Sequence, residues 1–500
     1  MKNISIINAI DLGAPATRPL LNGSSSFFRV LQFARSLPGV TQTALLASDA
    51  HPLPPDTPRD CRVIARRAWT VAELTAELEK LADGFEDVFY FFGDCPFLDL
   101  TVAGKMHGNH RRYWADYTFA DGYPQGLTPE IVTRDALSRL RGMSSSDTAI
   151  PDRETLFTVL RKDINSFDIE TELAPADLRL LRVSLSADTE RNFLLLKRVA
   201  QAGGTDIESI CRVLQNEPRI LRTLPAFFPI QVVERCPHAC SYCPYPVFAG
   251  EVTKKNGVME PEKFAQLVAG IAAFSGDAVI DISLWGEPSL HPQVLQLISS
   301  VLATPGLSLV IETSGIGWDP SILARVKDGF ATQPTWIVSL DASTEEMYKR
   351  LRGAGYGEAV KTAELLLTAF PATTWVQAVR MRENEDDLEL FFKTWKARTE
   401  NIIIQKYDSF STFLPDRKVA DLSPVKRFPC WHVKRDMAIL LDGTVPLCRE
   451  DLKREHVLGN AFTEELASIW ERGEVVYRQH IAENYLPLCA GCDEYYTYNF

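Results

Sequence analysis

Three cysteines crowd into one short stretch of this 500-residue chain, E-R-C-P-H-A-C-S-Y-C at residues 234–243. Cys236, Cys240 and Cys243 are separated by three and then by two residues. A disulfide uses two thiols, and a structural zinc site uses four donors. Three thiolates suit three irons of a 4Fe–4S cluster, and they leave the fourth iron open to bind a small molecule.

Seven of the ten cysteines fall into two groups. The second group lies in the tail and ends in a C-x2-C pair that could ligate either zinc or an iron–sulfur cluster: Cys430, Cys448, Cys489 and Cys492. The remaining three cysteines are scattered, and we expect them to be small buried hydrophobic residues: Cys61, Cys95 and Cys211.

The elements that must position the first group begin near residue 226. Apolar strands alternate there with amphipathic helical stretches such as 261–275, a pattern typical of parallel βα units. The predicted strands are F-P-I-Q-V-V-E-R before the cysteines, a strand within 278–288 that runs into a Gly-containing loop, and then 307–315, 335–342, 373–381 and 401–407. Six such units over residues 226–425 predict an α/β fold, a partial (β/α)6 TIM-like barrel with its chemistry at the carboxyl ends of the strands.

Two further domains flank this barrel. Residues 1–222 predict a separate α/β unit, with strands I-S-I-I-N-A-I and D-V-F-Y-F-F-G-D and a helix near 71–83. Residues 426–500 are rich in loops, and their four cysteines predict a small metal-stapled subdomain. Within it, M-A-I-L-L-D-G-T-V-P-L-C predicts a β-hairpin that turns at Asp442 and Gly443.

Composition narrows the class of protein. The net charge of −12 argues against a nucleic-acid partner, since such proteins need a basic face. No run approaches the ~18 apolar residues of a membrane span, and the N-terminus lacks the features of a signal peptide. We therefore expect a cytoplasmic protein, in which clustered cysteines hold metals or do chemistry more often than they form disulfides.

The C-x3-C-x2-C motif, followed by W-G-E-P after the second strand, resembles the radical S-adenosylmethionine (SAM) superfamily. The resemblance implies that SAM binds the open iron and that Tyr242 lies near its adenine. The W-G-E-P loop is similar to the family's G-G-E-P motif, with Trp285 in place of the first glycine. Gly286 and Glu287 would then meet the amino group of SAM.

Later strands supply the other SAM contacts that the resemblance implies. Ser339 and Asp341, in S-L-D-A, match the segment that contacts the carboxylate and ribose of SAM, and Ser314, Arg352 and Gln377 are further candidates. The implied reaction is reductive cleavage of SAM to a 5′-deoxyadenosyl radical, which abstracts hydrogen from a substrate. The electron would come from a flavodoxin- or ferredoxin-type reductant.

The tail resembles the SPASM and twitch extensions of radical SAM enzymes. A full SPASM extension carries more cysteines than the four present here, so the resemblance implies one fully ligated auxiliary 4Fe–4S cluster, and two clusters in the whole chain. Such a cluster would transfer electrons or staple the subdomain. Zinc remains the alternative for these four cysteines.

Residues 1–222 resemble the nucleotidyltransferase-like (GT-A type) domain of cytidylyltransferases. The matching segments are L-L-N-G-S-S-S-F-F-R-V-L at 20–31, G-D-C-P-F-L-D at 93–99 and G-Y-P-Q-G-L-T-P-E-I at 122–131. The resemblance implies a magnesium or ligand site at Asp94. The initial loop offers only Arg18 as a basic residue, and Ser186 stands at the place of a second metal-binding aspartate, two residues before Asp188. We therefore expect a domain that no longer transfers nucleotides.

The whole arrangement is similar to the proteins called spiro-SPASM. SPASM relatives favour a peptide or protein substrate, whereas the front domain favours a sugar- or nucleotide-linked one. Two other interpretations stay open at this point. The chain could be a bifunctional enzyme with an active nucleotidyltransferase, or a catalytically dead, zinc-stabilised binding protein.

Overall fold

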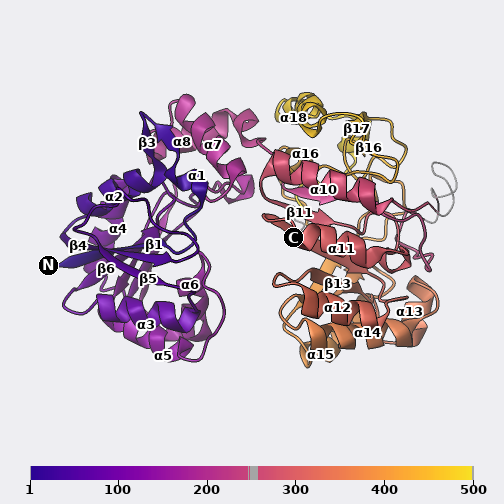
Figure 1. Ribbon diagram of the computed structural model, residues 1–500, viewed down its shortest axis with the longest axis horizontal. Coiled ribbons are helices and arrows are strands. Elements are labelled where there is room, and N and C mark those ends of the chain that lie inside the picture. The colour runs from indigo at the N-terminus through magenta and orange to yellow at the C-terminus, as the bar shows by residue number, and fades with distance from the viewer. Residues whose placement is uncertain (1, 246, 248–256, 498–500) are drawn as a thin grey trace. The chain divides into compact units, whose positions relative to one another are not determined.

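The computed structural model describes residues 2–245, 247 and 257–497 (Figure 1). The chain divides into two compact units, Met1–Thr223 and Leu224–Phe500. The predicted barrel and the cysteine-rich tail therefore lie in one unit, and the predicted front domain forms the other. None of the helices in the described ranges combines the length with the apolar character that a bilayer crossing requires.

The front unit is built on a seven-stranded mixed sheet of order β5-β4-β1-β6-β8-β7-β9. β8 runs antiparallel to both of its neighbours, and the other neighbouring strands are parallel. The strands are β1 (Asn3–Ala9), β4 (Val40–Ser48), β5 (Arg62–Arg66), β6 (Asp87–Phe92), β7 (Tyr117–Asp121), β8 (Glu130–Thr133) and β9 (Ile169–Leu173).

Two apolar cores cover the two faces of this sheet. Helices with one apolar face complete each core, and α3 begins at a capping box in which Thr70 and Glu73 bond each other's backbone amides. The principal helices are α2 (Ser26–Ser36), α3 (Val71–Leu81), α4 (Leu100–Arg112), α5 (Arg134–Ser144), α7 (Glu190–Gln201) and α8 (Ile207–Asn216).

The strand order of the front unit reverses between β1 and β6. From β1 the chain adds β4 and β5 on one side and then returns to add β6 on the other. In open α/β sheets, ligands bind at the carboxyl ends of strands at such a switch point. Asp94 lies two residues beyond the end of β6, so the fold places it at this crevice.

The second unit holds the predicted half-barrel. A six-stranded, all-parallel sheet of order β10-β11-β12-β13-β14-β15 curls around its own axis, which confirms the predicted α/β half-barrel. Its strands are β10 (Phe227–Pro229), β11 (Ala278–Asp281), β12 (Leu307–Thr313), β13 (Thr335–Ser339), β14 (Thr374–Arg380) and β15 (Ile402–Lys406).

Helices cover the outer face of the half-barrel (Figure 1). They are α10 (Pro261–Ser275), α11 (Val294–Leu302), α12 (Pro320–Gly329), α13 (Glu345–Leu351), α14 (Tyr356–Ala369) and α15 (Glu385–Lys396). The longest of these, α10, begins with Pro261 in its first turn and ends at Gly276, whose φ of +76° suits glycine.

Successive side chains along each strand point to opposite faces of the half-barrel. On β12, Leu309 and Ile311 join the large core beneath the helices. Glu312 points to the opposite, concave face, where it meets Ser339 of β13 and Gln377 of β14. The concave face therefore carries polar side chains at the carboxyl ends of neighbouring strands.

The tail packs on the same core as the barrel. Ile439 pairs with the edge of β10, because its amide donates to the carbonyl of Pro229 at 2.8 Å. The chain turns at Gly443, as predicted, but β16 (Thr444–Pro446) pairs antiparallel with β17 (Val457–Asn460). The predicted pairing of the hairpin was therefore wrong. The segment around Ile439 extends the barrel sheet and is not the partner strand of β16.

Short helices complete the tail: α16 (Trp431–Arg435), α17 (Leu466–Arg472), α18 (Glu474–Ile481) and α19 (Pro487–Ala490).

Candidate functional site

The cysteine triplet lies in the loop that leaves the barrel after β10. Cys236, Cys240 and Cys243 are each partly buried, and all are free thiols. Burial raises the pKa of Cys236 to about 11 and that of Cys243 to about 12. The charge of each thiolate also disfavours ionisation of its neighbours, so the three sulfurs share one small region. A cationic metal cluster would reverse that balance and hold them as thiolates.

The spacing of the sulfurs argues against zinc. Four sulfurs that bind one zinc ion at about 2.3 Å in a tetrahedron lie about 3.8 Å from one another. Within the described ranges, no set of three ligand atoms that includes a cysteine sulfur gathers within 4.8 Å. His238, inside the triplet, contacts the hydroxyl of Tyr348 at 3.3 Å, and burial lowers its pKa to about 4. The donor set therefore fits a cluster larger than one ion, with three protein ligands.

The W-G-E-P loop packs directly against the cysteine loop. The amide of Glu287 donates to the carbonyl of Arg235 at 2.8 Å. A Cβ atom on Gly286 would lie 2.2 Å from the carbonyl oxygen of Val233, so no larger residue fits without moving the backbone. Gly286 thus sets how closely the loop after β11 approaches the residues just before Cys236.

The side chain of Glu287 turns toward the end of β12. Its carboxylate accepts hydrogen bonds from the hydroxyl of Thr313 at 2.5 Å and from the amide of Ser314 at 2.8 Å. Burial raises its pKa, while these hydrogen bonds favour the charged form. The structure therefore brings the predicted residues Glu287 and Ser314 together at the same edge of the sheet.

Three predicted SAM contacts form one buried cluster. The hydroxyl of Tyr242 donates to the carboxylate of Asp341 at 2.5 Å, and Arg352 ion-pairs with the same oxygen at 2.5 Å. The other oxygen of Asp341 accepts from the amide of Val379 at 2.7 Å. These contacts tie the cysteine loop to the ends of β13 and α13.

The other two predicted contacts meet around a residue that the sequence analysis missed. Glu312 accepts hydrogen bonds from the Ser339 hydroxyl at 3.0 Å and from the Gln377 side-chain amide at 2.7 Å. Its own side chain stays exposed on the concave face. The signal was present in the sequence, because Glu312 interrupts an apolar strand one residue before its end.

Asp281 is a second missed acid on the concave face. Ser283 links it to Glu312: the amide of Ser283 donates to Asp281 at 2.9 Å, and the amide of Glu312 donates to the Ser283 hydroxyl at 2.7 Å. Burial, together with the charge of Glu312, raises the pKa of Asp281 to about 7.

All four cysteines of the tail line one pocket. They come from three places in the tail: Cys430 at the start of α16, Cys448 after β16, and Cys489 and Cys492 at α19. Burial raises the pKa of Cys430 to about 12 and that of Cys489 to about 11, and it raises the pKa of the other two thiols as well. Four thiols that line one pocket suit a fully ligated cluster.

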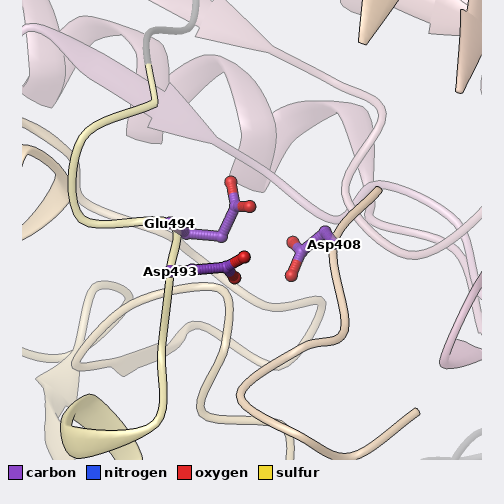
Figure 2. Close-up of side chains that lie close together, drawn as sticks. All are labelled: Asp408, Asp493 and Glu494. Atoms are coloured by element: carbon purple, nitrogen blue, oxygen red, sulfur yellow. The ribbon is translucent and has the colours of Figure 1, made fainter. Parts of the chain in front are cut away.

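A dense ion network lies beside this pocket. Asp408, Asp493 and Glu494 place their carboxylates within 4.8 Å of one another, and Figure 2 shows the three side chains converging. A metal ion could use these ligands, but cations of the chain already neutralise them. Arg449 lies 3.1 Å from Asp408, and Lys418 lies 2.6 Å from Asp493.

In the front unit, the predicted ligand Asp94 faces an internal cation. The guanidinium of Arg153 ion-pairs with Asp94 and reaches Asp188 at 3.4 Å. It also stacks over the ring of Phe92, at 4.7 Å from the centroid. Any magnesium ion at Asp94 would compete with Arg153. The scattered cysteines Cys61 and Cys95 are buried in this unit, and Cys211 is partly buried.

Sequence profiles of two protein families match the second unit. Residues 230–394 match the Radical SAM superfamily. Residues 430–493 match SPASM, an iron–sulfur cluster-binding domain, and this range contains all four cysteines of the tail.

Curated proteins give further matches. An uncharacterized protein of Treponema pallidum is 41% identical over 360 residues, which cover 69% of this chain and 98% of that protein. The GTP 3′,8-cyclase of Chlorobaculum tepidum is 28% identical over 169 residues, 32% of this chain and less than half, 47%, of the cyclase.

The solved structures to which the chain is similar include Streptococcus suis SuiB bound to the precursor peptide SuiA. The TM-score is 0.43, with 12% identity, and the match covers 64% of this chain and 76% of SuiB. Another is anSMEcpe with bound AdoMet, with a TM-score of 0.41 and 14% identity over 54% of this chain and 87% of that one.

The half-barrel, its three-cysteine loop and the two family matches agree with one another. We conclude that the chain contains a radical SAM superfamily domain and, in its tail, a SPASM iron–sulfur cluster-binding domain, and that it is an enzyme of the radical SAM class.

Proposed function

We propose that Cys236, Cys240 and Cys243 hold a 4Fe–4S cluster with one iron left for SAM. The observation that carries this proposal is the loop after β10, which places three free thiols in one short stretch of the chain. When bound there, the cluster and SAM supply reductive cleavage of SAM to a 5′-deoxyadenosyl radical, which abstracts hydrogen from the substrate.

The residues around the triplet have two roles: some would bind SAM, and others position the cysteine loop. Gly286 and Glu287 lie against the cysteine loop and present the polar edge that would receive the amino group of SAM. Ser314 supports Glu287 through its amide. Tyr242 fixes the cysteine loop on the barrel through its hydrogen bond to Asp341, which is ion-paired with Arg352. The ring of Tyr242 can therefore border the adenine while its hydroxyl stays in place. Fixed geometry of this kind lowers the entropic cost of reaction.

The concave face is the proposed substrate side. Ser339 and Gln377 hold Glu312 in place, and Asp281 extends this polar row onto the neighbouring strand. Such a surface suits a substrate rich in hydrogen-bonding groups, either a peptide or protein, or a sugar- or nucleotide-linked molecule. We propose a flavodoxin- or ferredoxin-type reductant as the electron donor and the cytoplasm as the compartment.

The four cysteines of the tail are proposed to hold a second, fully ligated 4Fe–4S cluster. With every iron bound by protein, this cluster would carry electrons or staple the tail rather than bind substrate. In the front unit, we propose that Arg153 takes the place of a magnesium ion between Asp94 and Asp188. The unit would then bind or position a substrate without transferring nucleotides.

The test is anaerobic reconstitution of the whole chain with iron and sulfide, followed by metal analysis. Two clusters correspond to about eight irons per chain. The loaded protein is then incubated with dithionite and SAM, and 5′-deoxyadenosine is measured by chromatography. Zinc in place of iron, or no 5′-deoxyadenosine, overturns the proposal.

The matched control replaces Cys236, Cys240 and Cys243 together with alanine. This variant should keep about four irons, those of the tail, and should form no 5′-deoxyadenosine. Cleavage of SAM by this variant would show that the reaction does not occur at the triplet.

A further inference from the structure

Trp285 holds a backbone conformation that disfavours its side chain. Its φ is +51°, in the left-handed region where a bulky residue is a genuine outlier. Glycine would adopt the same conformation freely, and the related family motif has glycine at this position. A strained residue persists only where the surrounding structure holds it, and such residues cluster at functional sites.

The side chain of Trp285 packs against the same buried residues as two of the proposed cluster ligands. It joins an apolar group with Cys236 and Cys243, in which Tyr245 and Leu452 are buried. Its carbonyl oxygen accepts a hydrogen bond from the side-chain amide of Gln231 at 3.0 Å, which fixes the strained backbone. The indole therefore belongs to the same apolar group as two of the three cysteines.

Phe410 adds a second aromatic ring to this apolar group. Its ring centroid lies 5.5 Å from that of Trp285, with the ring planes at 55°. Phe410 opens a run of three left-handed residues, Phe410 to Thr412, with φ values of +50°, +53° and +72°. Within this run, the Ser411 hydroxyl donates to the carbonyl of Leu488, directly before Cys489. The position of the Phe410 ring is thus tied to the loop that carries the cysteines of the tail.

The three sulfurs of the triplet consequently have unequal surroundings. Cys236 and Cys243 lie in the apolar group with Trp285 and Phe410. Cys240 lies near the charged pair of Arg352 and Asp341, and the charge of Arg352 also reaches Cys236 and Cys243. Exposure to solvent and hydrogen bonds to sulfur are two of the main factors that set the reduction potential of an iron–sulfur cluster.

We propose that Trp285 and Phe410 form an aromatic shield over the Cys236 and Cys243 side of the radical SAM cluster. The shield keeps water and oxygen from that side and keeps the cluster strongly reducing. The physical reason is that an added electron increases the negative charge of the cluster, and an apolar surrounding disfavours that charge. This inference rests on the proposed cluster at the triplet.

The test compares Trp285→Gly and Trp285→Phe with the unaltered chain after iron–sulfur reconstitution. Trp285→Gly relieves the backbone strain and removes the ring, whereas Trp285→Phe keeps an aromatic surface. The midpoint potential is measured by electron paramagnetic resonance on the signal that changes when SAM is added. Decay of the cluster in air-saturated buffer is followed by its visible absorbance.

Trp114→Gly is the matched control. Trp114 also has a left-handed φ, of +57°, but its side chain is 87% exposed and lies in the front unit. The proposal predicts a positive shift in potential and severalfold faster decay for Trp285→Gly, a smaller effect for Trp285→Phe, and none for Trp114→Gly. Phe410→Gly tests the same prediction independently, so a Trp285 variant that fails to load a cluster does not end the test.

Each adverse outcome has a distinct meaning. If the unaltered chain takes up no iron and shows no SAM-sensitive signal, the proposed function fails, and the shield fails with it. If Trp285→Gly and Phe410→Gly load the cluster and keep the original potential and decay rate, the shield alone is wrong. An equal shift in Trp114→Gly also contradicts it, because the effect would then follow from strain rather than from shielding.

Discussion

The hydroxyl of Tyr242 donates a hydrogen bond to the buried carboxylate of Asp341 at 2.5 Å, and this contact anchors the cysteine loop to the end of β13. The sequence analysis expected each of these residues to contact SAM separately. The structure pairs them with each other and with Arg352, whose side chain is also buried. The carboxylate therefore compensates a buried guanidinium and at the same time positions the loop that carries Cys240 and Cys243.

Asp341→Asn tests this arrangement through stability. The variant leaves the Arg352 guanidinium buried without its counter-charge, and we expect the free energy of unfolding to fall by about 3–5 kcal/mol. Tyr242→Phe removes one hydrogen bond to a charged group and should cost about 1–3 kcal/mol. Chemical denaturation of both variants measures these losses. Equal, small losses would mean that Asp341 does not compensate Arg352.

Gly286→Ala tests the close approach of the two loops. The added methyl group would meet the carbonyl of Val233 at 2.2 Å, and the backbone before Cys236 would have to move. We expect a loss of about 1–3 kcal/mol in unfolding free energy and reduced iron at the triplet after reconstitution. Gly270→Ala is the control, since its methyl group would find only Leu466, at 3.7 Å, and it should load iron normally.

The half-barrel could be predicted from the sequence because its strands are apolar and regularly spaced between helices. Some strands nevertheless end earlier than predicted, as at β13, which was predicted over 335–342 and stops at Ser339. The pairing predicted for the tail hairpin was wrong because strand pairing depends on which sheet edge is free. The segment around Ile439 pairs with the free edge of β10 instead.

Within the site, motif spacing predicted which residues gather but not what they bond. Glu312 and Asp281 escaped notice because an acidic residue at a strand end is common, and only the register of neighbouring strands shows that these two share the concave face. Arg153 was missed for a related reason. It lies far from Asp94 in the sequence, and no local pattern marks an ion pair of that separation.

Cys489→Ala tests the division of the cysteines between two clusters. The four thiols of the tail line a pocket of their own, so losing one ligand should cost the auxiliary cluster and spare the other. We expect iron to fall from about eight to about four per chain, with the SAM-sensitive resonance signal retained. Cys211→Ala serves as the control, because this cysteine belongs to neither group. Loss of the SAM-sensitive signal in Cys489→Ala would contradict this division.

The raised pKa of Glu130 predicts how the stability of the front unit depends on pH. Burial raises its pKa from 4.5 to about 7, although the Tyr117 hydroxyl donates to it at 2.7 Å. Between these two values the folded state holds a proton that the unfolded chain has lost, so stability falls as pH rises from 4.5 to 7. The loss amounts to as much as about 3 kcal/mol above pH 7.

Thermal unfolding of Glu130→Gln between pH 4 and pH 8 measures this effect. The variant should lose most of the pH-dependent decline and should gain stability relative to the unaltered chain as pH rises. Glu208→Gln, at an exposed position, should leave the decline unchanged. A decline in Glu130→Gln as steep as that of the unaltered chain would assign the pH dependence to other groups.

Arg153→Met tests whether an arginine stands in for a metal ion in the front unit. The variant leaves Asp94 and Asp188 without their shared cation, and we expect a loss of about 2–3 kcal/mol in unfolding free energy. Added Mn²⁺ should restore part of this loss, because an ion that binds only the folded state stabilises it by mass action. The unaltered chain should show no such gain, and neither should Arg153→Met combined with Asp94→Asn. Stabilisation of the unaltered chain by Mn²⁺ that Asp94→Asn abolishes would show instead that the site holds a metal beside Arg153, and release of pyrophosphate from nucleoside triphosphates and sugar phosphates would then make the front unit a working transferase.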